Sequence, residues 1–354
     1  MANTPPRLVL VISTPLESEL VERIRAVAPD RIEVRHVPDL LPKPRYPADH
    51  SGPPDFRRSA QDEKRWNDLI ASADILWDIP PKRPGGSTVI DDAKNLRWVQ
   101  TTSSGVGPLV KKLKLIERGV EVTTARGLHA VPLTEFVFMA LLMHVKRLLH
   151  MQKEQAARRW EYTCSDTLEG KMLSIVGLGG IGRRIAATGK QFGMTVASLL
   201  RPGRTAKPAD FGIDDLFAAD AFHDMLEVSD ILVLCAPHTP DTHRMLDKAA
   251  FKALKPGAVL VNIARGTLVD EAAMIDALQS GRLAFAALDV FDTEPLPADS
   301  PLWGMPNVLV SPHSASTVAT ENERITEVFC HNLRLFLDGR YDEMRNRFHA
   351  DRGY

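Results

Sequence analysis

The 354-residue chain has few of the features that mark secreted, membrane or metal-knuckle proteins. It contains only three cysteines, Cys164, Cys235 and Cys330, which are too few and too scattered for a disulfide scaffold or a metal knuckle. The longest unbroken apolar run, 136–143, covers eight residues, whereas a membrane-spanning helix needs about 20. The first residues lack the charged region and the small-residue cleavage site of a secretion signal. We therefore expect a cytoplasmic protein without a membrane partner.

An excess of charge of one sign is also missing. Lys and Arg number 44 against 45 for Asp and Glu, so the formal net charge is −1. Because a polyanion-binding protein usually carries a basic excess or a basic stripe, nucleic acid is not expected as a partner. Hydrophobic residues make up 44% of the chain and charged residues 25%, which is ordinary for globular proteins. At this length, the composition indicates two or three domains.

Proline, in contrast, is abundant, with 25 residues. Six of them lie between Pro38 and Pro54, within the segment 37–60. Proline has no amide proton and a fixed φ, so these positions cannot support a helix or a central strand. We expect a long irregular loop and interpret it as a surface or lid segment that shapes a binding pocket.

Short apolar runs alternate with helix-like stretches in two series, as in proteins whose helices cover parallel sheets. Strands are predicted at 7–13, 32–37, 74–79, 97–102 and 121–124 in the first series, and at 171–176, 195–200, 230–236, 258–263, 284–291 and 308–311 in the second. Helices are predicted over 15–28, 132–160 and 320–337. The helix over 132–160 is apolar almost all round in its first half, so it packs in a core or in a dimer interface.

Residues 177–182, GLGGIG, match the GxGxxG template of dinucleotide-binding proteins, between an apolar strand and a helix. In that template Gly177 permits a tight turn, Gly179 lets the backbone approach a pyrophosphate, and Gly182 lets helix and strand pack closely. The pyrophosphate would lie against free N–H groups at the start of the helix, where Gly180 and Ile181 stand. The loop therefore predicts a dinucleotide cofactor.

The choice of dinucleotide depends on the end of the next strand, where an NAD-binding protein usually carries an acidic residue about 20 positions on. Here the strand ends in Leu200, and Arg201 and Arg204 follow it. No carboxylate can bind the ribose 2′-hydroxyl or repel a 2′-phosphate, whereas two guanidinium groups could hold that phosphate. We predict that NADP(H) is preferred and that NAD(H) can also be used.

Three polar residues follow later strands: Arg265 in VNIARGTLVDE (261–271), Glu294 in LDVFDTEPLP (288–297) and His313 in SPHSAS (311–316). A histidine suits proton transfer near neutral pH, a carboxylate can orient it, and a guanidinium can bind a carboxylate and polarise a carbonyl. Hydride reduction of a 2-keto acid needs these three groups. Each residue alone has an ordinary structural explanation, so their joint occurrence after a dinucleotide loop carries the prediction. HTPDTH (238–243) could suggest a metal, but no metal site is expected.

Taken in order with HTPDTHRML (238–246), RWVQTTSSGVG (97–107) and ARGLHAVPLTEFVFMALL (125–142), these motifs resemble the D-isomer-specific 2-hydroxyacid dehydrogenases. The resemblance extends from about residue 96 to residue 337. It implies a catalytic triad formed by Arg265, Glu294 and His313. It also implies that backbone amides at Ser104 and Gly105 hold the substrate carboxylate and that Asp289 lies near the nicotinamide carboxamide.

By the same resemblance, the fold is α/β. A Rossmann-type doubly wound parallel sheet (126–315) is inserted in a smaller flavodoxin-like α/β substrate domain (1–125 and 316–354). The helix over 132–160 would help to form a homodimer through the dinucleotide-binding domains. With Leu200 in place of the family's common NAD-selecting aspartate, the cofactor loop resembles that of NADPH-dependent glyoxylate and hydroxypyruvate reductases. The implied reaction is the NAD(P)H-dependent reduction of a small 2-keto acid to the D-2-hydroxy acid.

Other functions remain open at this point. Formate dehydrogenases share the framework but pair a glutamine with the histidine, so Glu294 argues against them. Phosphite dehydrogenases keep the same triad, and phosphoglycerate oxidation is compatible with it. A non-catalytic, dinucleotide-sensing co-repressor or scaffold can also retain these residues. A turnover assay separates the enzymes from the binding protein.

Overall fold

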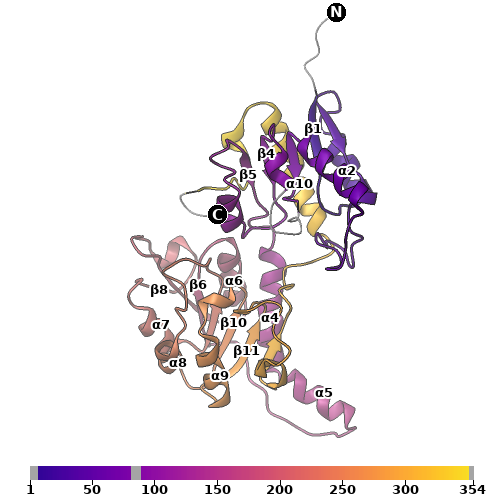
Figure 1. The fold of residues 1–354 in the computed structure, drawn as a ribbon. Helices are drawn as coiled ribbons and strands as arrows, with labels where there is room; N and C mark the ends of the chain where they lie inside the picture. Colours follow the sequence, from indigo (N-terminus) through magenta and orange to yellow (C-terminus); the bar gives the residue numbers. More distant parts are fainter. Residues whose placement is uncertain (1–6, 81–88, 351–354) are drawn as a thin grey trace, which may run out of the picture. The chain divides into compact units, whose positions relative to one another are not determined.

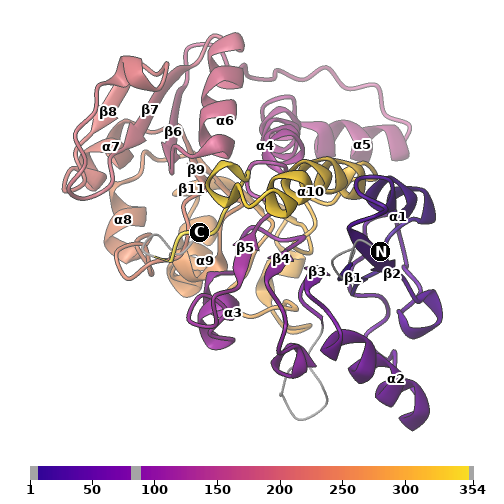
Figure 2. The same ribbon diagram turned by 90° about the horizontal axis from the view of Figure 1, so that it is seen from above.

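The computed structural model describes residues 7–80 and 89–350. Contacts divide the chain into two compact units, Met1–Leu128 with Thr317–Tyr354, and His129–Ser316. Each unit contains one sheet whose paired strands are all parallel, which confirms the predicted fold class (Figures 1 and 2). Within the described ranges, no helix combines the length and the apolar character needed to cross a membrane.

The first unit has five strands in the order β2-β1-β3-β4-β5: β1 (Leu8–Ile12), β2 (Ile32–Arg35), β3 (Ile75–Trp77), β4 (Trp98–Gln100) and β5 (Glu121–Thr123). This is the flavodoxin-like order of a doubly wound sheet. Its helices are α1 (Ser18–Arg25), α2 (Ala60–Ala71), α3 (Gly107–Lys112) and α10 (Glu321–Leu337). Because ligands of such sheets bind beyond the carboxyl ends of the strands, the residues after β1, β3 and β4 are candidates for contact with a ligand.

Alternate residues along these strands enter two different apolar cores. Trp77 and Trp98 pack with residues of α1 and α10 on one face, whereas Leu76 and Val99 pack with α2 and α3 on the other. Trp98 stacks on Phe329 of α10, with ring centroids 4.7 Å apart. The two-residue period of a strand explains this division, since successive side chains point to opposite faces. Both faces of this sheet are therefore covered by apolar side chains, which fixes the ends of its strands.

The proline-rich segment is irregular, as predicted. A short 3-10 turn, Pro38–Leu40, is followed by no helix or strand until α2 begins at Ala60. The loop is nevertheless held in place by Asp49, whose buried carboxylate accepts hydrogen bonds from the Arg45 side chain and from the Ser51 and Gly52 amides. The Arg45 guanidinium holds the pKa of Asp49 well below its usual range. The proline-rich segment is therefore an irregular loop held by its own hydrogen bonds. That it shapes a binding pocket remains a prediction.

The second unit has seven strands in the order β12-β11-β10-β9-β6-β7-β8: β6 (Met172–Val176), β7 (Thr195–Leu199), β8 (Asp215–Phe217), β9 (Ile231–Leu234), β10 (Ala258–Asn262), β11 (Leu283–Leu288) and β12 (Val308–Val310). The order reverses between β6 and β9, as in Rossmann-type sheets. The strand β8 is short and only partly buried, and the apolar pattern did not predict it. The glycine loop follows β6 and therefore lies at this reversal, which is where ligands of such sheets usually bind.

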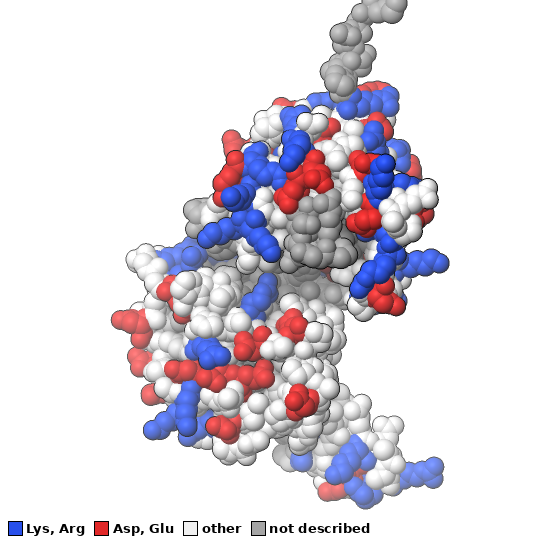
Figure 3. Space-filling model, in the orientation of Figure 1, with Lys and Arg blue, Asp and Glu red and all other residues white. Residues whose placement is uncertain are grey.

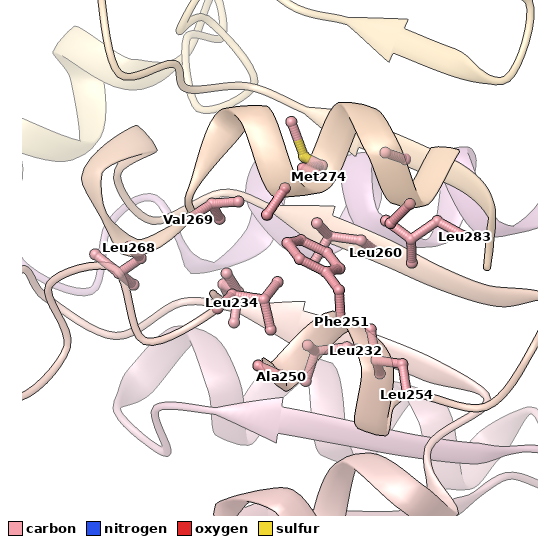
Figure 4. Packing of buried hydrophobic residues seen from close by; sticks show 14 of the residues in the cluster. Leu232, Leu234, Ala250, Phe251, Leu254, Leu260, Leu268, Val269, Met274 and Leu283 are labelled. Atoms are coloured by element: carbon pink, nitrogen blue, oxygen red, sulfur yellow. The ribbon is translucent and has the colours of Figure 1, made fainter. Parts of the chain in front are cut away.

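Helices cover both faces of this sheet. One face packs against α4 (Ala130–Val145) and α6 (Gly180–Gln191), and the other against α7 (Phe222–Val228), α8 (Lys248–Ala253) and α9 (Glu271–Gln279). Figure 4 shows the second core, where Phe251 of α8 lies among Leu232, Leu260 and Met274. An apolar core on each face of the sheet explains why the strands of this unit are almost continuous in apolar residues. On the molecular face drawn in Figure 3, basic and acidic side chains are intermixed, in keeping with the net charge.

The prediction of one helix over 132–160 is wrong. The structure has α4 up to Val145 and a separate helix α5 (Leu148–Ala156), and residues 157–160 are not helical. The break lies at Arg147, whose φ of 55° is left-handed. In that conformation its guanidinium donates to Thr163 Oγ1 at 2.5 Å, and this contact ties the following chain back to the break. Neither glycine nor proline marks the position, so the apolar period alone could not reveal it.

Candidate active site

The three residues predicted to act on a substrate follow three neighbouring parallel strands. Arg265 comes three residues after β10, Glu294 lies in the loop after β11, and His313 comes three residues after β12. These strands are adjacent in the order β12-β11-β10. Because parallel strands end at the same edge of a sheet, the fold brings the three loops together.

His313 and Glu294 form a direct pair. The ring Nδ1 of His313 lies 2.7 Å from Oε2 of Glu294, and Oε1 of the same carboxylate accepts the amide of Phe291 at 3.0 Å. One carboxylate oxygen is therefore fixed by the backbone while the other orients the ring. Nε2 of His313 has no hydrogen-bond partner among residues 7–80 and 89–350, and the side chain is about half exposed. This leaves one ring nitrogen available for proton transfer to a bound molecule.

The backbone at His313 is left-handed, with φ at 52°, and the buried carboxylate of Asp289 holds the residues around it. Oδ1 of Asp289 accepts three hydrogen bonds, from Ser311 Oγ at 2.5 Å, Ser314 N at 2.9 Å and Ala315 N at 3.0 Å. Burial raises the pKa of Asp289 despite these donors. The Ser311 contact depends on the pairing of β11 with β12 and leaves no local pattern in the sequence.

Arg265 stands in a tightly packed turn. The buried side chain of Asn262, at the end of β10, accepts from the Ala264 amide at 3.0 Å and donates to the carbonyl of Arg265 at 3.1 Å. A Cβ at the next residue, Gly266, would lie 1.9 Å from the carbonyl carbon of Phe291, so this turn rests directly on the loop that carries Glu294. In the described part of the chain, no hydrogen bond or ion pair joins the exposed Arg265 side chain to Glu294 or His313.

The glycine loop lies between β6 and α6, as predicted. A Cβ at Gly182 would lie 1.9 Å from the carbonyl oxygen of Gly177, so the helix and the turn need glycine for their own packing. A Cβ at Gly179 would meet nothing within 4 Å. The absence of a side chain there leaves an open cradle at the start of α6, in front of Gly180 and Ile181. The loop therefore fits a pyrophosphate approached by the backbone and by the helix N–H groups.

The loop that follows β7 carries the predicted selector residues. β7 ends at Leu199, and the amide of Leu200 donates to Phe217 of β8 at 2.9 Å. Arg201 and Arg204 are exposed, and a turn closed by the Arg204 amide on the Arg201 carbonyl at 3.2 Å joins them. Both guanidinium groups are thus attached to one short turn at the carboxyl end of β7.

Ser104 and Gly105 belong to the first unit, where they follow β4. The amides of Ser103, Ser104 and Gly105 donate no hydrogen bond to any residue that the structure describes. Unpaired consecutive N–H groups are suited to bind an anion. This observation fits a carboxylate site at these two residues.

The described residues contain no strong candidate for a metal site. His238 Nε2 and His243 Nδ1 are 3.2 Å apart, but no third ligand group accompanies them in the ranges 7–80 and 89–350. Among the described residues, the one cluster of three possible metal ligands consists of His150, Glu154 and Glu161. Both oxygens of Glu154 already hold the Arg159 guanidinium at 2.6 Å. The Glu154 carboxylate is therefore already paired with a cationic side chain.

Comparison with known proteins decides the family. The sequence profile described as "D-isomer specific 2-hydroxyacid dehydrogenase, NAD binding domain" matches residues 138–315. The chain belongs to the D-isomer specific 2-hydroxyacid dehydrogenase family. It is an enzyme of that family with an NAD(P)-binding domain, and the resemblance noted in its sequence is confirmed.

Individual relatives of this dehydrogenase carry different names. It is 32% identical over 280 residues to a glyoxylate reductase of Thermococcus gammatolerans, covering 76% of this chain and 81% of that protein. It is 32% identical over 299 residues to a D-3-phosphoglycerate dehydrogenase of Mycobacterium leprae, which is 79% of this chain but only 54% of that protein. A crystal structure of a D-isomer specific 2-hydroxyacid dehydrogenase from Xanthobacter autotrophicus Py2, in complex with NADPH and MES, is 27% identical with a TM-score of 0.73, covering 99% of this chain and 100% of that one.

Proposed function

We propose that this enzyme reduces a small 2-keto acid, of the size of glyoxylate or hydroxypyruvate, to the D-2-hydroxy acid with NADPH. The observation that carries the proposal is the His313–Glu294 pair at 2.7 Å, with the second carboxylate oxygen fixed by the Phe291 amide. Such a pair delivers a proton from a defined direction, which the reduction of a carbonyl requires. The similarity to a glyoxylate reductase supports the size of the substrate.

Each proposed step uses a group of this chain. The bound nicotinamide cofactor supplies the hydride. His313 holds a proton on Nε2 and donates it to the carbonyl oxygen of the substrate, while Glu294 stabilises the imidazolium at Nδ1. Arg265 binds the substrate carboxylate and polarises the carbonyl as negative charge develops on its oxygen. In the reverse reaction the neutral ring accepts the proton.

Each unit, taken by itself, offers proposed binding groups on loops that follow its strands. In the first unit, the unpaired amides at Ser104 and Gly105 bind the substrate carboxylate. In the second, the loop that carries Gly177, Gly179 and Gly182, with the first residues of α6, holds the pyrophosphate. We also propose that Asp289 accepts a hydrogen bond from the nicotinamide carboxamide, since its Oδ2 has no partner among the described residues.

The cofactor preference is assigned to the turn after β7. Arg201 and Arg204 would bind the 2′-phosphate, and Leu200 offers no carboxylate to repel it. The NADPH complex of the Xanthobacter relative supports this choice. A charge-assisted hydrogen bond contributes about 1.5–3 kcal/mol, so each good contact should favour NADPH roughly 10- to 150-fold.

One steady-state experiment tests both parts of the proposal. Oxidation of NADPH and NADH is followed with glyoxylate, hydroxypyruvate, pyruvate, phenylpyruvate and branched 2-keto acids. We expect turnover with the small acids and a KM at least about tenfold lower for NADPH than for NADH. Arg204→Ser should raise the KM for NADPH and leave that for NADH unchanged, whereas Arg184→Ser, an exposed position on α6, should change neither.

The outcomes separate the alternative functions. A lower KM for NADH would refute the proposed preference. Oxidation of phosphite or of 3-phosphoglycerate with NADP⁺ or NAD⁺, without reduction of the small acids, would assign the enzyme to those reactions. Cofactor binding without turnover of any of these compounds would indicate a dinucleotide-sensing protein on the same fold.

We further propose that the enzyme is a homodimer joined through its dinucleotide-binding domains. Within the second unit, α5 extends away from the sheet (Figure 1). The side chains of Leu149 and Met151, which belong to this helix, are exposed. Trp160 and Tyr162, just beyond it, are about 90% exposed. Large apolar side chains gathered on one protruding segment are typical of a surface covered by another chain. A monomeric mass in sedimentation equilibrium at micromolar concentration would contradict the proposal.

A further inference from the structure

Asp78, the residue after β3 of the first unit, has a conformation that few residues with a side chain adopt. Its φ is 68°, in the left-handed region, where aspartate is one of the better-tolerated residues. The amide of Asp78 continues the strand pairing by donating to Gln100 O at 2.7 Å, and its carbonyl accepts from Ser13 Oγ at 2.9 Å. The backbone is therefore fixed on both sides of this turn.

Both carboxylate oxygens of Asp78 accept hydrogen bonds from Thr102, which lies two residues beyond the end of the neighbouring strand β4. Oδ2 accepts from Thr102 Oγ1 at 2.7 Å, and Oδ1 accepts from Thr102 N at 3.3 Å and from Ile79 N at 2.8 Å. Thr102 is buried, so water competes weakly for these bonds. Three donors share one carboxylate, which offsets its negative charge.

The residue after Thr102 begins the segment with unpaired amides. The carbonyl of Ser103 accepts from Thr101 Oγ1 at 2.6 Å and from Ala125 N at 3.3 Å, so this carbonyl is turned towards the protein. The amides of Ser103, Ser104 and Gly105 donate to no described residue. Asp78 therefore fixes Thr102 at the start of this segment. The hydrogen bonds accepted by the Ser103 carbonyl fix the peptide between Ser103 and Ser104.

We propose that Asp78 is a positioning residue, which fixes through Thr102 the backbone whose amides bind the substrate carboxylate. The identity of that ligand rests on the proposed function, whereas the bracing of the segment rests on the contacts alone. Asp78 does not touch the substrate carboxylate in this arrangement. Its loss should therefore weaken substrate binding and leave the cofactor and the proton donor unaffected.

Asp78→Gly is the decisive variant, because glycine accepts the left-handed backbone without the carboxylate. We expect the KM for the 2-keto acid to rise about tenfold, with kcat changed less than about threefold and the KM for NADPH unchanged. Thr102→Val should reproduce this effect, and Thr102→Ser should preserve the wild-type KM because it keeps the hydroxyl. Asp74→Asn is the matched control, since Asp74 precedes the same strand and its Oδ2 accepts from Val9 N at 2.8 Å.

Hydrogen exchange of the Thr102 amide gives a readout that does not depend on turnover. In Asp78→Gly this amide should exchange at least about tenfold faster than in the wild type and in Asp74→Asn. An unchanged exchange rate, a wild-type KM in Asp78→Gly, or an equal rise of KM in Asp74→Asn would each overturn the inference. A wild-type enzyme that reduces no 2-keto acid would instead refute the proposed function, and the exchange rate would still decide whether Asp78 braces the segment.

Discussion

Replacing His313 with alanine should lower kcat about 10³-fold, while the Kd for NADPH stays within about twofold of the wild type. A positioned general acid–base contributes roughly 10²- to 10⁴-fold to a rate, and His313 is proposed as the donor of the proton to the substrate. The glycine loop lies at the end of β6, so the substitution removes none of its contacts. The measurements are steady-state turnover with the preferred 2-keto acid and fluorescence titration with NADPH.

The left-handed backbone at His313 calls for a second variant. His313→Asn also tolerates a φ of 52°, because asparagine is enriched in that region, but its amide cannot supply the proton. Both variants should therefore lose activity to the same extent. If the asparagine variant kept activity near the wild-type rate, the histidine would serve the turn and not proton transfer. Equal loss of NADPH affinity in both variants would show that the damage is structural.

Replacing Arg265 with alanine should lower kcat/KM about 10³-fold, through a higher KM for the 2-keto acid and a lower kcat together. The guanidinium is proposed to bind the ground-state carboxylate and the developing negative charge on the carbonyl oxygen, so both constants should change. Arg265→Lys should recover only part of the loss, because an ammonium group cannot make two parallel hydrogen bonds. The constants are measured with NADPH at saturation.

Arg244 offers a matched control for this experiment. Its amide donates to the carbonyl of Thr267 at 2.8 Å, and its exposed guanidinium lies 3.9 Å from Asp292, so it borders the same pair of loops. Arg244→Ala should leave both constants within about twofold, since an exposed ion pair contributes little. A similar loss in Arg244→Ala and Arg265→Ala would mean that positive charge in the region matters and not the specific guanidinium. A change of KM alone in Arg265→Ala would limit its role to binding.

The placement of much of the candidate site was predictable because its chemistry-bearing residues follow apolar strands. Once Arg265, Glu294 and His313 were placed after strands of one parallel sheet, the common carboxyl edge brought their loops together. The glycine loop was predictable for the same reason, since its spacing is tied to a strand and a helix. The sequence therefore predicts which loops lie close together, whereas the 2.7 Å contact between His313 and Glu294 depends on side-chain conformations that a sequence pattern does not determine.

Other features depend on contacts between distant residues and leave no local pattern. The carboxylate of Asp78 meets Thr102 across two strands, 24 residues further along the chain. The break at Arg147 is stabilised by a contact with Thr163, and the residues around it favour a helix. The strand β8 is three residues long and half-exposed, so it lacks a continuous apolar run. Contacts between residues distant in the sequence determine each of these three features, and the local conformational preference of the residues does not.

The open space at Gly179 has a consequence for how this chain can diverge. A methyl group there would have no atom of the described residues within 4 Å apart from its chain neighbours, whereas one at Gly182 would collide with the turn. A descendant that no longer needed a dinucleotide could therefore accumulate alanine at 179 without loss of fold, but not at 182. Drift at the two positions would be governed by different selective pressures, which are the proposed binding of the dinucleotide at Gly179 and the packing of the fold at Gly182. Among descendants of this chain, the residue at 179 would record whether the cofactor is still in use.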